Sequence, residues 1–137
     1  MAIAHDVFAI TTKNQTEAVD ITHHVNQAIG ASGIEDGIVL ISVPHATAGV
    51  YVNENEQGLV RDVVKVLREM FYDRSDYEHD RIDNNAAAHV ASAVIGSSVS
   101  LPVAHNTLVL GTWQRVFLFE LDGPRSRTVH VTVVGEA

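Results

Sequence analysis

The sequence predicts an α+β fold: one domain with mixed or antiparallel sheets of about seven strands and about three helices. Three observations predict it. The chain has 137 residues, which suits a single domain over residues 1–137. Apolar runs typical of strands lie in both halves of the sequence. An amphipathic helical stripe lies between them.

The first elements are a strand and a helix. Residues 3–11 alternate enough between apolar and polar side chains to predict a strand. Apolar residues recur at helical spacing within residues 21–29, so a helix is expected there, with Asp20 or Thr22 as its cap. The glycines within residues 30–33 end that helix.

The middle of the chain holds two strands, a helix and a polar loop. Residues 37–43 are almost wholly apolar and β-branched, which is typical of a strand buried on both faces. A second strand is expected around residues 51–52. Apolar residues then fill one helical face over residues 59–71, with Asn55 as a candidate cap. The loop over residues 72–84 is long and polar, which favours a functional role.

A short helix and several strands complete the chain. Asp83 or Asn85 is expected to cap a helix that runs to about Ile95 and ends at Gly96. Val129, with the residues that follow it, shows the clean two-residue alternation of a strand. The remaining strands are expected over residues 98–103, 106–111, 115–121 and 127–134.

Charge and composition exclude several kinds of partner. The chain carries 9 Lys and Arg residues against 17 Asp and Glu, a formal charge of −8. Such a balance argues against nucleic acid or an anionic membrane as the main partner, but it allows a small phosphorylated ligand. There is no cysteine, so any metal must be held by histidines and carboxylates. The start of the sequence lacks a basic signal region, and a cytoplasmic protein is expected.

Three histidines are candidate metal ligands. His45, His79 and His89 each lie near a predicted element end, among small or acidic residues, and three neutral imidazoles that converge would form an open divalent-metal site. Glu54 and Asp83 are candidate acid/base groups or partners of the ligands. For any single histidine, the alternative is a hydrogen-bonded or surface residue. The other histidines are expected to be structural or solvent-facing: His5, His23, His24, His105 and His130.

Further residues are candidates for contact with a substrate. Trp113 and Gln114 are suited to line a pocket, although the favoured interpretation of Trp113 is a core residue. The segment 122–125 is predicted to be a turn. Arg125 and Arg127 are the best candidates to bind a phosphate or carboxylate, with an ion pair to Asp122 or Glu120 as the alternative for Arg125.

These motifs, taken in order, resemble the YjbQ-like family, also called UPF0047. Ala46 departs from the hydroxyl residue that is usual in the first motif, and Arg115 stands where a small or apolar residue is more common. The motifs that carry the resemblance are His45-Ala46-Thr47-Ala48-Gly49, Asn53-Glu54-Asn55, Tyr77-Glu78-His79, Asp83-Asn84-Asn85 with His89, Leu101-Pro102-Val103, Leu110-Gly111-Thr112-Trp113-Gln114 and Asp122-Gly123-Pro124-Arg125.

The resemblance implies a homotrimer, a pocket with three histidines and weak thiamine-phosphate synthase activity. In that reaction a pyrimidine diphosphate is joined to a thiazole phosphate. Zinc is the expected metal, with magnesium as the alternative. We expect Thr47, Asn53, Gln114 and Arg125 to contact the substrate. Because three histidines suit zinc, whereas diphosphate chemistry usually employs magnesium held by carboxylates, the synthase activity is interpreted as a side reaction. A non-catalytic trimeric protein that binds a metal or a metabolite is the alternative.

Overall fold

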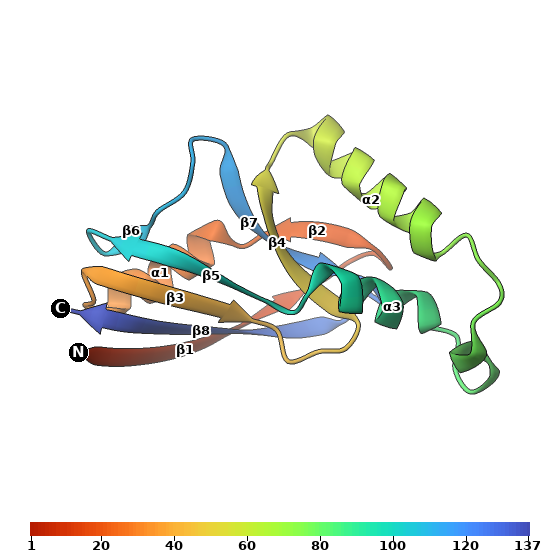
Figure 1. Ribbon diagram of the computed structural model, residues 1–137, viewed down its shortest axis with the longest axis horizontal. Helices are drawn as coiled ribbons and strands as arrows, with labels where there is room; N and C mark the ends of the chain where they lie inside the picture. Colours follow the sequence, from red (N-terminus) through yellow and green to blue (C-terminus); the bar gives the residue numbers. More distant parts are fainter.

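Two antiparallel sheets form the frame of the molecule (Figure 1), and the computed structural model describes residues 1–137. The larger sheet has the strand order β1-β8-β3-β5-β6, and the smaller has the order β2-β7-β4. The elements are β1 (Ala2–Thr11), β2 (Glu17–Asp20), α1 (Thr22–Ser32), β3 (Asp36–Ser42), β4 (Ala48–Glu54), α2 (Gln57–Phe71), a 3₁₀ helix (Glu78–Arg81), α3 (Ala86–Ile95), β5 (Ser98–Ala104), β6 (Thr107–Leu108), β7 (Gln114–Glu120) and β8 (Ser126–Glu136).

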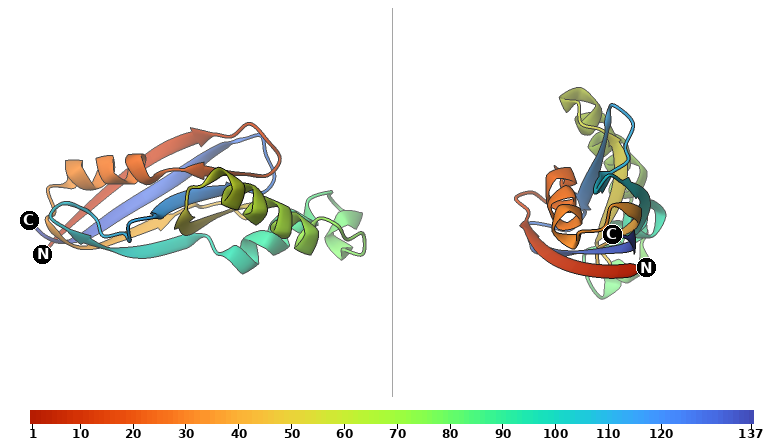
Figure 2. Two further views of the ribbon diagram at one scale, coloured as in Figure 1. Left: turned by 90° about the horizontal axis from the view of Figure 1, so that it is seen from above. Right: turned by 90° about the vertical axis from the view of Figure 1, so that its left-hand side faces the viewer.

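The predicted α+β class is confirmed, and all the strand pairs are antiparallel. The main core lies between the inner face of the larger sheet, one face of the smaller sheet and α1. Val39 and Val131 enter it from the larger sheet, Leu118 enters it from the smaller sheet, and Ile29 enters it from α1. The two chain ends lie side by side at one end of the larger sheet, because β1 and β8 pair along their whole length (Figures 1 and 2).

The other two helices cover the far face of the smaller sheet. Leu67 of α2 and Ala91 of α3 pack there with Phe119 of β7. Tyr51 of β4 stacks on Phe117 with ring centroids 4.9 Å apart. Burial raises the pKa of Tyr51 to about 12. The smaller sheet is therefore buried on both faces, as its apolar strand β7 requires.

The prediction that residues 37–43 are buried on both faces is wrong for the single chain. Val39 and Ile41 are fully buried, but Ile38 is 59% exposed and Leu40 is 42% exposed. Strand alternation places Ile38 and Leu40 on the outer face of the larger sheet, which no helix covers. Apart from Asp36 and Glu136, which pair at one end of the sheet, the outward positions of the long strands carry no Lys, Arg, Asp or Glu: Ile3, His5, Val7, Ala9, Ile38, Leu40, Ser42, Ser98, Ser100, Pro102, Thr128, His130, Thr132 and Val134.

Two helix caps differ from the sequence prediction. Glu56, and not Asn55, caps α2, since its carboxylate accepts the amides of Gly58 and Leu59. At α3, Asn85 stands at the N-cap position as predicted, but its side chain accepts no helix amide, and the Ala86 amide donates to Asp80 instead, at 3.1 Å. Both helices begin within two residues of the predicted position, because the apolar period and not the cap dominates the prediction.

Strand β2 was not predicted, and β6 is much shorter than the predicted strand over residues 106–111. Strand β2 has four residues, and none of them is fully buried, so its sequence shows no clear alternation. None of the helices is long and apolar enough to cross a membrane.

Candidate functional site

The structure places His89 next to His79, and His89 also shares a cavity wall with His45. His79 lies in the 3₁₀ helix and His89 on α3, and their ring centroids are 5.0 Å apart. His45 lies in the loop between β3 and β4, and with His89 it lines a cavity of about 340 Å³. Ser92 of α3 and Ser97 add hydroxyl groups to the wall of that cavity. We call this region the histidine pocket.

A hydrogen-bond chain orients His79. The Asn85 amide nitrogen donates to Asp122, at 3.1 Å, so the amide oxygen faces the other way. That oxygen lies 3.1 Å from Nε2 of His79 and can only accept. Nε2 therefore carries the ring proton, and Nδ1 of a neutral His79 holds a free lone pair. A ligand histidine whose second nitrogen donates to a fixed acceptor is the usual arrangement in metal sites.

His45 is held differently. Its Nε2 accepts the Thr128 amide, at 2.9 Å, so Nδ1 carries the proton when the ring is neutral. Burial, and after it the positive charge of Arg127, hold the pKa of His45 below its ordinary value. His45 thus lacks a free lone pair in this orientation. Accordingly, no group of three His, Asp or Glu side chains has the arrangement to hold a metal ion.

A buried ion pair lies behind the pocket. Arg127 donates to Glu120 through Nε and Nη2, and both side chains are almost fully buried. Nη2 also donates to the carbonyl and hydroxyl oxygens of Thr47, at 2.9 Å each. Burial by itself raises the pKa of Glu120, but the hydrogen bonds from Arg127, Thr12 and the Asp122 amide outweigh it and leave the pKa below its ordinary value.

Two of the candidate substrate contacts are therefore engaged inside the protein. The Arg127 guanidinium is buried in the ion pair, and the Thr47 hydroxyl faces it. Arg125 forms an ion pair with Asp122, at 3.0 Å, as the alternative interpretation had it, but about half of its side chain stays exposed. The segment 122–125 is the predicted turn, with a cis peptide bond at Gly123–Pro124.

The candidate acid Glu54 lies far from the histidine pocket. It is the last residue of β4, whereas His45 precedes the first. At about 3.3 Å per strand residue, the seven residues of β4 separate the two by roughly 20 Å. Asp83 is exposed in the loop before α3, where its carboxylate accepts the Asn84 amide, at 2.8 Å. Neither carboxylate contacts a candidate ligand.

A second, smaller cavity of about 260 Å³ surrounds Glu54. Trp113 lines it and is 71% exposed, so the interpretation of Trp113 as a core residue is wrong. Arg115, which had no explanation in the sequence, pairs with Asp20 in its wall, at 2.7 Å.

The other predicted substrate contacts at this end of the molecule accept hydrogen bonds from backbone amides. Gln114 accepts the Gly111 amide, at 2.8 Å, and closes the turn before β7. The Asn53 side chain accepts the Glu54 amide, at 2.8 Å. Both side chains are exposed.

Sequence reasoning missed the partners that organise the site. Asn85 was seen only as a helix cap, and Asp122 only as a turn residue or a partner of Arg125. Glu120 stands in a strand of apolar residues, where a carboxylate is buried only if it is paired. That position was the one signal in the sequence for the ion pair with Arg127.

The comparisons with known proteins agree on one family. The family model described as UPF0047 protein YjbQ-like matches residues 6–136. A UPF0047 protein of Methanothermobacter thermautotrophicus is 38% identical over 93% of this chain and 89% of its own length. The UPF0047 protein YugU of Bacillus subtilis is 37% identical over 92% of this chain and 96% of its own.

Solved structures show the same fold. A YbjQ-like protein of unknown function from Sulfolobus solfataricus superposes with a TM-score of 0.96, at 41% identity, over 98% of this chain and 99% of its own. A hypothetical protein from Aeropyrum pernix gives a TM-score of 0.93, at 38% identity, over 96% of this chain and 98% of its own. These names state no activity for either protein.

Proposed function

The chain belongs to the UPF0047 protein YjbQ-like family, and from that premise we propose that it is a metal-assisted enzyme acting on a small phosphorylated molecule. We further propose weak thiamine-phosphate synthase activity, as a side reaction. The observation that carries the proposal is the orientation of His79. Its Nδ1 lone pair is free, and its ring meets His89 beside an open cavity.

The residues fit a divalent metal in part. His79 and His89 supply imidazole nitrogens, which zinc prefers, and Asn85 fixes the ligand tautomer of His79. His45 joins them only if its ring exchanges the Thr128 hydrogen bond for the metal. Because the pKa of His45 is already low, little proton competition opposes that exchange at neutral pH. The bound metal would supply a Lewis acid and a water of lowered pKa.

The protein's own groups then act on the substrate. In the synthase reaction, the thiazole nitrogen bonds to the pyrimidine methylene carbon, and the bond from that carbon to the diphosphate oxygen breaks. Arg125 is the exposed cation nearest in sequence to the Asp122–Asn85 chain, and we assign it to the leaving phosphates. With Arg127 buried, few cations are available for this step, and we expect a low rate.

We propose that the protein works as a homotrimer. The outer face of the larger sheet carries acidic side chains only at one end, at Asp36 and Glu136, and it exposes Ile3, Ile38 and Leu40 to solvent. Large apolar side chains gathered on one face mark an association surface. The proposed number of subunits comes from the family resemblance, whereas the choice of face rests on its exposed apolar side chains.

Metal analysis tests the site. His79→Ala and His89→Ala should each remove most of the zinc that the wild type retains after dialysis at pH 7.5. His24→Ala is the matched control, since His24 stacks on Phe8, away from the pocket, and should keep its zinc. A wild type without stoichiometric metal, or equal loss in the control, would show that the site is wrong.

One observation favours the alternative, a non-catalytic trimeric protein that binds a metal or a metabolite. Glu54 and the histidine pocket lie at opposite ends of β4, so a single chain does not bring this predicted acid/base group to the proposed metal. Synthase assays on metal-loaded and chelator-treated protein separate the two functions. Turnover that disappears on chelation supports the enzyme, whereas stoichiometric metal without turnover supports the binding protein.

A further inference from the structure

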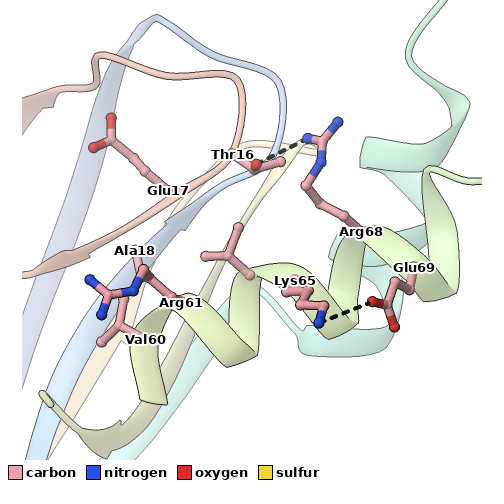
Figure 3. A pocket seen from close by; sticks show the side chains of 9 residues that line it. Thr16, Glu17, Ala18, Val60, Arg61, Lys65, Arg68 and Glu69 are labelled. Atoms are coloured by element: carbon pink, nitrogen blue, oxygen red, sulfur yellow. Dashed lines mark hydrogen bonds and ion pairs between the residues drawn. The ribbon is translucent and has the colours of Figure 1, made fainter. Parts of the chain in front are cut away.

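The largest cavity of the molecule lies away from the histidine pocket, between α2 and β2 (Figure 3). Its volume is about 510 Å³, within the usual range of about 300–1,000 Å³ for small-molecule sites. Thr16, Glu17 and Ala18 line it from β2 and the segment before it, and one side of α2 forms the opposite wall. We call it the α2 groove.

Three cations face this groove from the helix. Arg61, Lys65 and Arg68 follow one another at spacings of four and three residues, so they lie on one face of α2. The whole chain has only 9 Lys and Arg residues, so a third of them line one cavity of a protein with a charge of −8. The local charge is thus opposite to that of the molecule.

The two acids of the groove neutralise these cations poorly. The Glu17 carboxylate points away from α2 in Figure 3 and accepts the amides of Lys13 and Asn14. Glu69 approaches Lys65 only to 4.0 Å, with both side chains exposed, and such a pair is weak.

The two arginines have different roles. Arg68 is already positioned, because Nη1 donates to the side chains of Gln15 and Thr16, at 3.1 Å each, and its guanidinium lies 4.7 Å from the centre of the Tyr72 ring. Its remaining N–H groups are free to bind a ligand without much further loss of side-chain entropy. Arg61 forms no ion pair with the protein, and in Figure 3 it lies toward the other end of the groove, near Ala18.

The floor between the cations is apolar. Ala18 of β2 faces Val60 and Val64 of α2, and these three residues supply the hydrophobic part of the lining. A bare anion would leave that surface in contact with water, whereas a ligand with a short apolar body would cover it. Guanidinium groups bind phosphate through paired hydrogen bonds, and a dianion suits more than one cation.

From these contacts we propose that the α2 groove binds a small phosphate monoester with a short apolar body. The site shares no residue with the histidine pocket and does not depend on the proposed metal. An acidic peptide added to the free edge of β2 is the competing occupant, and the test below distinguishes it.

The test is a titration of the full-length protein with phenyl phosphate, followed by calorimetry and by backbone amide NMR. The amides of residues 16–18 and 60–68 should shift, and phenyl phosphate should bind at least about tenfold more tightly than inorganic phosphate, because its ring covers the apolar floor. Equal affinity for the two, or shifts confined to the histidine pocket, would overturn the proposal. So would tighter binding of an acidic peptide.

Two variants that each remove one positive charge test whether the ligand binds to the cations of the groove. Arg61→Gln should weaken phenyl phosphate about tenfold or more, since a charge-assisted hydrogen bond to the phosphate is lost. Arg61 makes no ion pair with the protein, so this change leaves the fold intact. Arg74→Gln is the control: Arg74 pairs with Asp76 outside the groove, and its variant should stay within twofold of the wild type. Equal weakening in both variants would indicate nonspecific attraction and refute the site.

Discussion

Replacement of Glu120 by Gln tests how the ion pair behind the histidine pocket supports the fold. The two carboxylate oxygens together accept from the Thr12 hydroxyl, from Arg127 and from the amides of Leu121 and Asp122. Glu120→Gln keeps the size of the side chain but turns one of these oxygens into a donor. Whichever oxygen is replaced, buried donors then face a donor, and the Arg127 charge has no counter-ion.

The expected loss of stability is large. The side chains of Glu120 and Arg127 are 0% and 4% exposed, and removal of one partner from such a pair costs about 3–5 kcal/mol. With a urea m-value of about 2 kcal/mol/M, the midpoint of unfolding should fall by roughly 1.5–2.5 M. Arg125→Gln breaks an ion pair whose arginine is half exposed, and it should cost less than about 1 kcal/mol.

The pH dependence follows from the lowered pKa of Glu120. A carboxyl whose folded pKa lies below its unfolded value of about 4.3 contributes stability above that value and loses it as the pH falls through the folded pKa. The difference in free energy of unfolding between the wild type and Glu120→Gln should therefore be largest at pH 7 and shrink below about pH 4.

The assay is urea unfolding followed by circular dichroism, at one fixed protein concentration because the stability of an oligomer, such as the proposed trimer, depends on concentration. The reasoning would be refuted if the unfolding midpoint of Glu120→Gln fell no further than that of Arg125→Gln. It would also be refuted if the stability difference between the wild type and Glu120→Gln did not change in acid.

Three further predictions concern assembly, the metal and sheet packing. Leu40→Lys should convert the assembly to smaller species in light scattering, whereas Val94→Lys, an exposed change on α3, should not; equal behaviour of the two would argue against the outer sheet face. Asn85→Ala should weaken zinc about 10–100-fold in a competition titration, because His79 loses the acceptor that fixes its tautomer, and unchanged affinity would remove that role. A Cβ on Gly37 would lie 2.0 Å from a carbonyl oxygen of β8, so Gly37→Ala should lower the free energy of unfolding in urea by about 1–3 kcal/mol. Gly30→Ala is the control: its added Cβ meets no atom closer than 3.8 Å, so the stability should be equal or higher. The reverse order of the two variants would contradict the packing.

The sequence was sufficient for the elements with a strong apolar period. The stripe from Leu59 to Phe71 predicts α2, and the alternation from Val129 predicts β8, because each pattern is local and matches one backbone geometry. The same reasoning fails for β2, whose four residues are held by pairing with β7 and not by their own pattern. The prediction that β3 is buried on both faces was also wrong, since a local apolar run does not show whether a second layer covers the outer face of the sheet.

The sequence by itself determined the candidate residue types and their order along the chain: three histidines, few cations and no cysteine. Only the tertiary structure decided which of them meet. His79 contacts Asn85, which is held by Asp122. Arg127 is buried against Glu120, and Glu54 lies at the far end of β4. Such contacts join residues distant in sequence, and they depend on strand register and helix docking, which act over the whole chain and leave no local pattern in the sequence.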